Sequence, residues 1–223
     1  VYVALTVGAS SYMNLGNNFV QEGLANRITP FTTTNNGKNG SAKNFDTEKT
    51  YRNVMTRYKF GGLQKKGLYV DETVMRMCYT HRRLFAQLAQ ELIKEGKYDK
   101  AKKVLDKCLE VLPAYNIPHN YVSGSLDLAE CYAILGQQQK AEQLFNAVWK
   151  NSEQYVDFYL ALSGNNFDIS MSDCLREFTI MQECSKIAPL ISQTLAKKTE
   201  KIFQNKFVNY REKGGYVPIQ KGK

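Results

Sequence analysis

One stretch of the sequence decides the fold because it recurs, with variation, further along the chain. The first copy lies within residues 82–115, RRLFAQLAQELIKEGKYDKAKKVLDKCLEVLPAY, and the second lies within residues 122–153. Equivalent positions are forty residues apart: Leu88, Ala89, Leu92, Gly96, Ala101 and Leu105 correspond to Leu128, Ala129, Tyr132, Gly136, Ala141 and Phe145. Self-similarity at a fixed period predicts a repeat architecture, in which each copy is one supersecondary unit.

The conserved steps within each copy indicate a pair of antiparallel helices. Ala89 and Ala129 are small enough to let two helices approach closely, and Gly96 and Gly136 stand where a helix end needs a left-handed backbone. Apolar residues on both sides of each glycine return at intervals of three and four, which is the helical period. We therefore expect a mainly α fold.

This pattern resembles the tetratricopeptide repeat, in which large apolar, small, glycine, aromatic and proline positions follow at set steps. The first copy fits from Phe85 to Pro113, whereas the second has Ser125 at the aromatic position and Glu153 at the proline position. The resemblance implies helix pairs stacked in an α-α superhelix. Its concave face would bind a polypeptide or a partner domain.

The organisation around the repeats is predicted from local signals. Residues 1–45 read as a small mixed lead-in, with strands at 1–7 and 24–28 and turns at 35–37 and 39–40. Residues 46–210 read as the helical repeat domain, with Asp46 and Asp71 as helix N-caps. A degenerate third pair is expected over 152–208, with helices at 152–162 and from Ser170 onward, where Ser170 and Asp173 have capping-box spacing. Pro189 should kink its long last helix, and 211–223 should form a flexible basic tail.

Composition narrows the class of protein. The formal net charge is +9, and most of the excess lies after Ala196. No apolar run approaches the length that a membrane-spanning helix requires.

The chain opens at Val1 without a signal-peptide pattern, so we read it as a fragment of a longer protein. Five widely spaced cysteines without a C-x-x-C pair favour buried free thiols, which fit an oxidising compartment poorly.

Several further stretches resemble the C-terminal soluble part of a bacterial family of multi-spanning membrane proteins of unknown function, related to protein O-mannosyltransferases. They are 1–4 (VYVA), 22–25 (EGLA), 59–63 (KFGGL), 75–85 (MRMCYTHRRLF), 117–119 (IPH) and 123–129 (SGSLDLA). The resemblance implies a parent with a membrane-embedded, glycosyltransferase-like region and an extramembrane domain on the periplasmic side of the inner membrane. The family's presumed catalytic carboxylates lie outside this chain, so no catalytic residue is carried over.

Candidate binding residues fall into two sequence groups. The first is Tyr79, His81, Arg82 and Arg83, where an imidazole and two guanidiniums could bind a phosphate, although Arg side chains paired with Asp71 or Glu72 are the stronger expectation. The second follows Pro118 and continues along the next helices, with His119 either on a polar rim or in a capping or structural role. Its members are His119, Asn120, Tyr121, Tyr155 and Tyr159.

Three functional hypotheses follow. The leading one is a non-catalytic interaction or accessory domain of a membrane glycosyltransferase, with no cofactor and no metal. The second is a binder of nucleic acid or anionic surfaces through the basic C-terminal helix, and nucleic acid is the less favoured partner. The third is a catalytic domain that uses His81 or His119 with a carboxylate. Neither a nucleophile elbow nor a glycine-rich phosphate loop is present, which argues against hydrolase and nucleotide chemistry.

Overall fold

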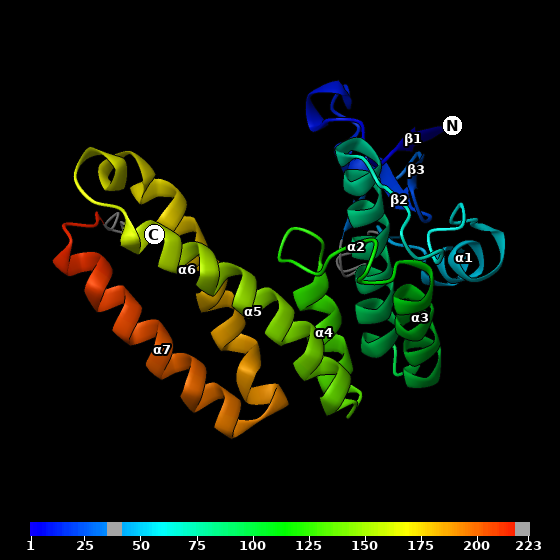
Figure 1. Ribbon diagram of the computed structural model, residues 1–223. Coiled ribbons are helices and arrows are strands. Elements are labelled where there is room, and N and C mark those ends of the chain that lie inside the picture. The colour runs from blue at the N-terminus through cyan, green and yellow to red at the C-terminus, as the bar shows by residue number, and fades with distance from the viewer. Residues whose placement is uncertain (35–41, 217–223) are drawn as a thin grey trace. The chain divides into compact units, whose positions relative to one another are not determined.

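The computed structural model describes residues 1–34 and 42–216, so the turns predicted at 35–37 and 39–40 and the end of the predicted tail lie outside it. The chain divides into two compact units, Val1–Pro118 and His119–Lys223 (Figure 1). We call them the first unit and the second unit, and describe each by itself.

The first unit begins with a small antiparallel sheet. Strand β3 (Ala25–Ile28) lies between β1 (Tyr2–Ala4) and β2 (Phe19–Gln21), and short 3-10 turns η1 (Ala9–Ser11) and η2 (Gly16–Asn18) separate the outer strands. A second pair, β4 (Thr33–Thr34) and β5 (Ala42–Lys43), is parallel. The predicted strands at 1–7 and 24–28 are present but shorter, and the alternation pattern did not reveal β2.

The turn between β2 and β3 depends on a glycine. Gly23 has φ +97°, and a β-carbon built there would lie 2.2 Å from the Tyr58 hydroxyl oxygen. That hydroxyl accepts a hydrogen bond from the Leu24 backbone N–H at 2.9 Å. The turn can therefore pack against Tyr58 only because residue 23 lacks a side chain.

Helix α1 (Thr47–Arg52) begins where the sequence predicts it. The Asp46 carboxylate accepts a hydrogen bond from the Lys49 N–H, as an N-cap should, and the helix continues as a π-helical turn, η3 (Asn53–Arg57). Asp71 likewise caps α2 (Glu72–Lys94) by accepting from the Thr73 and Val74 N–H groups. Both predicted caps are confirmed.

The first repeat copy forms α2 and α3 (Tyr98–Val111). The two helices are joined at Gly96, which has φ +72°, and they run antiparallel (Figure 1). Ala89 and Ala101 are fully buried, as expected for the small residues at a close helix contact. Pro113 follows the end of α3, and the preceding Leu112 has left the helical region at φ −125°.

Polar contacts attach the lead-in to this helix pair. Lys43 Nζ lies 2.8 Å from both Glu91 and Glu95, and Gln21 exchanges hydrogen bonds with Gln87. Burial disfavours ionisation of Glu95, but the hydrogen bonds from Lys43, Lys97 and Thr47 outweigh it and lower its pKa to about 2. The strands are therefore held to the α2 region by ion pairs and by hydrogen bonds between uncharged side chains.

The second unit consists of four helices, α4 (Ser125–Ile134), α5 (Gln138–Ala161), α6 (Asn165–Ile191) and α7 (Gln193–Glu212). Helices α4 and α5 form the second repeat copy, joined at Gly136 with φ +72°. Ala129, Ala141 and Phe145 are fully buried. Helices α6 and α7 follow as a second antiparallel pair, whose aromatic core contains Phe178 and Tyr210 with ring centroids 5.5 Å apart.

Three details of the predicted third pair are wrong. Residues 152–162 are not a separate helix, because α5 continues without a break to Ala161. Ser170 does not cap a helix: α6 begins at Asn165, and the Ser170 hydroxyl donates back to the Asn166 and Phe167 carbonyls. The expected long helix kinked at Pro189 is instead two helices, separated by Ser192 with φ −164°. Pro189 removes one backbone donor from the last turn of α6, and the Ser192 hydroxyl then caps α7.

The predicted fold class is confirmed: the chain is mainly α, built from helix pairs, with a small strand-containing segment at its start. All five cysteines are buried free thiols, which also agrees with expectation. Among the helices described, none combines the length and the apolar character that crossing a bilayer would require.

Candidate functional site

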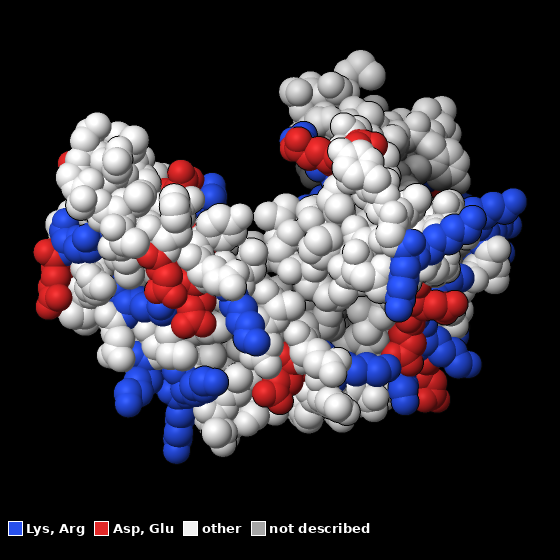
Figure 2. Space-filling model, viewed as in Figure 1, with Lys and Arg blue, Asp and Glu red and all other residues white. Residues whose placement is uncertain are grey.

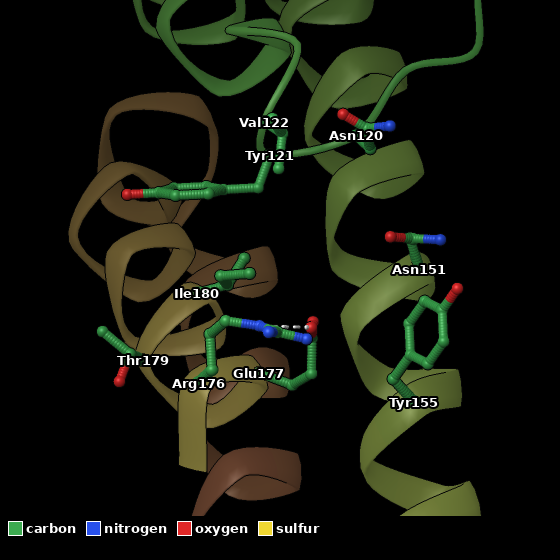
Figure 3. Close-up of a pocket in the computed structure, with 9 residues that line it drawn as sticks. All are labelled: Asn120, Tyr121, Val122, Asn151, Tyr155, Arg176, Glu177, Thr179 and Ile180. Atoms are coloured by element: carbon green, nitrogen blue, oxygen red, sulfur yellow. Dashed lines mark ion pairs between the residues drawn. The ribbon is translucent and has the colours of Figure 1, made fainter. Parts of the chain in front are cut away.

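The second unit contains a groove between α5 and α6, closed at one end by the loop that precedes α4 (Figure 3). Its volume is about 610 Å³. We call it the α5–α6 groove. Its lining consists of loop residues Asn120, Tyr121 and Val122, α5 residues Asn151 and Tyr155, and α6 residues Arg176, Glu177, Thr179 and Ile180.

Helical spacing explains how these side chains meet. Asn151 and Tyr155 are four residues apart on α5, and Arg176 and Ile180 are four apart on α6, so each pair shares one helix face. Figure 3 shows the Arg176 and Glu177 side chains of α6 extending toward α5, where Asn151 and Tyr155 lie. Tyr155 is 49% exposed, whereas Ile180 is buried. The groove therefore has an apolar floor and an accessible aromatic wall.

Charged groups on α6 form a small network, of which Arg176 and Glu177 line the groove and Asp173 lies just outside its lining. The Arg176 guanidinium lies 3.0 Å from the Asp173 carboxylate and 3.5 Å from the Glu177 carboxylate. Glu177 is only 6% exposed, although it is charged. One cation is therefore shared between two carboxylates.

Two tyrosines show the local electrostatic environment. Burial raises the pKa of Tyr159, and the Asp173 carboxylate raises it further. Burial likewise raises the pKa of Tyr121, followed by the effects of Glu183 and Asp127. Both shifts have the direction expected for a phenol that is partly buried and near negative charge, because such a phenol loses its proton less readily.

The loop before α4 is held by hydrogen bonds among its polar side chains. His119 Nδ1 lies 2.8 Å from Ser125 Oγ, which in turn lies 2.8 Å from Ser123 Oγ. The Asn120 carboxamide oxygen accepts from the Ser123 N–H at 2.8 Å. His119 is therefore bonded within the loop that carries Tyr121, and it does not cap α4, whose N-cap is Gly124.

In the first unit, Arg82 is completely buried. Its guanidinium donates to the backbone carbonyls of Leu112, Ile117 and Pro118. Burial lowers the pKa of this guanidinium. The expected ion pair with Asp71 or Glu72 is wrong for Arg82, because carbonyl oxygens surround it and Glu72 pairs with Arg76 instead. Arg82 therefore fastens residues 112–118 to α2, and it is inaccessible to a phosphate.

The neighbours of Arg82 have separate surroundings. His81 is half-buried against the rings of Tyr58 and Phe60, and burial lowers its pKa. Arg83 is exposed and donates to the Thr80 hydroxyl at 3.2 Å. Tyr79 is half-buried. These residues share helix α2, but His81 and Arg82 face inward and Arg83 faces outward.

The structure brings three predicted residues, Asn120, Tyr121 and Tyr155, into the α5–α6 groove. Tyr159 lies one turn beyond Tyr155, with the rings stacked at 6.5 Å. Sequence reasoning missed the other groove residues, which are Val122, Asn151, Arg176, Glu177, Thr179 and Ile180. The four-residue spacing of Asn151 and Tyr155 was the available signal, but it required knowing that α5 continues beyond residue 151.

Basic side chains gather over α7, as Figure 2 shows, and acidic side chains lie over the adjoining part of α5. Lys206 on α7 pairs with Asp157 and lies 3.7 Å from Glu153, both on α5. Part of the basic character therefore contributes to packing within the second unit. Binding of anionic surfaces through α7 stays a prediction.

Neither histidine is among the described residues that line the groove, and in the part of the chain that the structure describes no group of His, Cys, Asp and Glu is arranged to hold a metal ion. Comparison with known families shows similarity to the tetratricopeptide repeat over residues 83–115. No significant match was found among curated proteins or among solved structures. The matched residues are the first repeat copy, α2 and α3.

Proposed function

We propose that this chain is a protein-interaction module whose second unit binds an extended polypeptide segment in the α5–α6 groove. The tetratricopeptide similarity supports a role in protein interaction, because such repeats generally bind peptides or protein partners. The observation that carries the groove assignment is its lining, which combines accessible aromatic residues with hydrogen-bonding groups in one concave surface.

The chemistry of this lining suits a peptide. Tyr121 and Val122 are 41% and 61% exposed, so apolar side chains of a ligand could bury against them. Tyrosine offers a rigid apolar face together with a hydroxyl, which is why it is common at interfaces. The Asn151 carboxamide can donate to and accept from a peptide backbone, whose polar groups need partners when they leave water.

Peptide selection from a random library, followed by affinity measurement on variants, tests this proposal. Tyr155→Ala should lower the affinity for the selected peptides about tenfold, because an interface tyrosine often contributes roughly 1 to 2 kcal/mol. Tyr69→Ala is the matched control, since Tyr69 is 88% exposed on the first unit and the same atoms are removed. Equal affinities for the two variants would show that the groove is not the binding site.

The wider assignment rests on the resemblance of residues 1–4, 22–25, 59–63, 75–85, 117–119 and 123–129 to a family of membrane proteins. We propose on that basis that the module is the extramembrane, periplasmic C-terminal domain of a glycosyltransferase-like membrane protein. The coding sequence upstream of Val1 tests this at once. Several apolar segments of about 20 residues are expected there, as spanning helices require, and a coding region that begins close to Val1 would contradict the assignment.

A further inference from the structure

The burial of Glu177 is poorly compensated by its partner. This residue is 6% exposed, and its ion pair with Arg176 is long, with the Arg176 Nε 3.5 Å from the Glu177 carboxylate. Strong charge-assisted hydrogen bonds to carboxylates are about 2.7 to 2.9 Å long. A carboxylate also has about four acceptor positions, which one long contact cannot fill. Glu177 therefore has capacity to accept from a further cation in the groove that it lines.

Arg176 does not remove this capacity, because it is engaged elsewhere. Its guanidinium is closer to Asp173, at 3.0 Å, and its side chain is 62% exposed. An exposed ion pair of this kind contributes little and exchanges readily with solvent or with a competing cation. A ligand cation could thus bind both carboxylates while Arg176 turns toward water.

Aromatic rings belong to the same groove as Glu177. Tyr155 lines the groove and stacks on Tyr159 with ring centroids 6.5 Å apart. Tyrosine faces attract ammonium and guanidinium groups through cation–π interactions. A tyrosine face next to a carboxylate with spare acceptors recognises Lys or Arg better than it recognises Asp or Glu.

Carboxylates also affect Tyr121, which lines the groove on the loop before α4. Burial raises the pKa of Tyr121 most, and the carboxylates of Glu183 and Asp127 raise it further. Lys186 opposes them more weakly. Lys186 itself pairs with Glu183 at 2.6 Å. The carboxylates at and near the groove therefore have the opposite sign to the chain as a whole, whose formal net charge is +9. Overall charge and groove charge favour opposite ligands, which makes the two effects separable by experiment.

We propose that the α5–α6 groove selects peptides that carry a Lys or Arg side chain, whose cation is bound by Glu177 and Asp173 beside the Tyr155 ring. This inference rests on the proposed function, because it specifies the ligand of the same groove. The apolar floor at Ile180 would take the neighbouring ligand side chain.

The test uses the full chain and peptides selected from a random library. Each selected peptide is made in three versions, with Lys, Gln or Glu at its basic position, and affinity is measured by fluorescence anisotropy. The Lys version should bind about tenfold more tightly than the Glu version, as close charge pairs at interfaces allow. The overall charge of the chain alone would produce the opposite order.

Variants locate the charge effect. Glu177→Gln and Asp173→Asn should each reduce the preference for Lys over Glu several-fold, while Arg176→Gln should preserve or increase it by freeing the carboxylates. Glu142→Gln is the matched control, since Glu142 is exposed on α5 outside the groove lining and loses the same charge. Circular dichroism melting checks that each variant folds, and Asp173→Asn, at an exposed site, keeps the test decisive if Glu177→Gln is unstable.

The outcomes separate this inference from the proposed function. Peptides that prefer Glu, or that lose binding in Arg176→Gln, would show a groove that binds peptides of the opposite charge. Binding that is sensitive to Tyr155→Ala but indifferent to Glu177→Gln and Asp173→Asn would also overturn the inference and leave the proposed function intact. Peptides whose binding ignores Tyr155→Ala would overturn both.

Discussion

The two repeat copies share their buried residues but differ in where their second helices end. Helix α3 ends at Val111, before Pro113, whereas α5 continues to Ala161. Glu153 occupies the position equivalent to Pro113, and Asn151 corresponds to Val111. Asn151 and Tyr155, which form one wall of the α5–α6 groove, thus lie at or beyond the point where the first copy stops. The absence of a proline at residue 153 allows α5 to continue to the residues that form this wall of the groove.

The copies also differ at the start of their first helices. Phe85 fills the aromatic position of the first copy and is 1% exposed. Ser125 occupies the equivalent position of the second, where it is fully buried within hydrogen bonds to His119 and Ser123. A residue that departs from the repeat pattern therefore supports the loop that carries Tyr121. Both departures from the pattern contribute to the same groove.

The largest expected effect comes from placing a proline at residue 153, the position equivalent to Pro113. Glu153→Pro should destabilise the second unit by about 4 kcal/mol, because proline inside a helix loses a backbone hydrogen bond and clashes with the preceding turn. It also removes the acceptor of the Trp149 indole N–H, which bonds Glu153 at 2.9 Å. Urea unfolding followed by the fluorescence of Trp149, the single tryptophan, measures the loss.

Glu153→Ala is the control for that change, since it removes the same side chain and keeps the helix. It should cost about 1 kcal/mol, the contribution of one hydrogen bond. Similar losses for the two substitutions would show that helix continuity past residue 152 is unimportant for the second unit.

A second prediction concerns the buried arginine that only the first copy has, since Val122 is its equivalent in the second. Arg82→Ala should destabilise the first unit by about 3 kcal/mol, because three backbone carbonyls lose their donor inside the protein. Arg83→Ala, at the exposed neighbour, should change stability by less than about 0.5 kcal/mol. Chemical denaturation followed by circular dichroism compares them, and equal effects would contradict the anchoring role of Arg82.

The smallest expected effect is a difference in acid sensitivity. Burial opposes ionisation of Glu22, but hydrogen bonds from Lys49, Arg27 and Tyr2 lower its pKa to about 2. A folded-state pKa below the unfolded value means that this stabilisation is present above about pH 4.5 and is lost as the pH falls toward 2. Glu95 behaves alike, so acid should weaken the first unit.

In the second copy, burial and then the Asp127 charge raise the pKa of Glu130. Protonation of Glu130 in acid should therefore stabilise helix α4 rather than destabilise it. Urea unfolding at about pH 3 should then show an early transition by circular dichroism and a later one by Trp149 fluorescence. Glu22→Gln should reduce the shift of the early transition between neutral and acidic pH. Coincident transitions with no shift would contradict this difference between the units.

Local sequence signals were sufficient to predict much of the fold but only a small part of the candidate site. The caps at Asp46 and Asp71 and the helix ends at Gly96 and Gly136 depend on residues within a few positions, so they could be predicted. Residue Ser170 misled because the capping-box spacing occurs inside α6, where the hydroxyl bonds its own helix instead. Capping-box spacing identifies an N-cap only where a helix actually begins, and α6 begins five residues before Ser170.

The sequence by itself determined the repeat, because helix period, small contact residues and terminal glycines act locally and are copied at one offset. Only the tertiary structure decided what two charged residues do. Arg82 was expected to bind a phosphate or to pair with a carboxylate, and no role was predicted for Glu177. Yet Arg82 is enclosed by carbonyls from residues 112–118, and Glu177 is buried in the α5–α6 groove. A charge can be buried only when distant backbone or side chains surround it, and that enclosure depends on how helices pack rather than on neighbours in sequence.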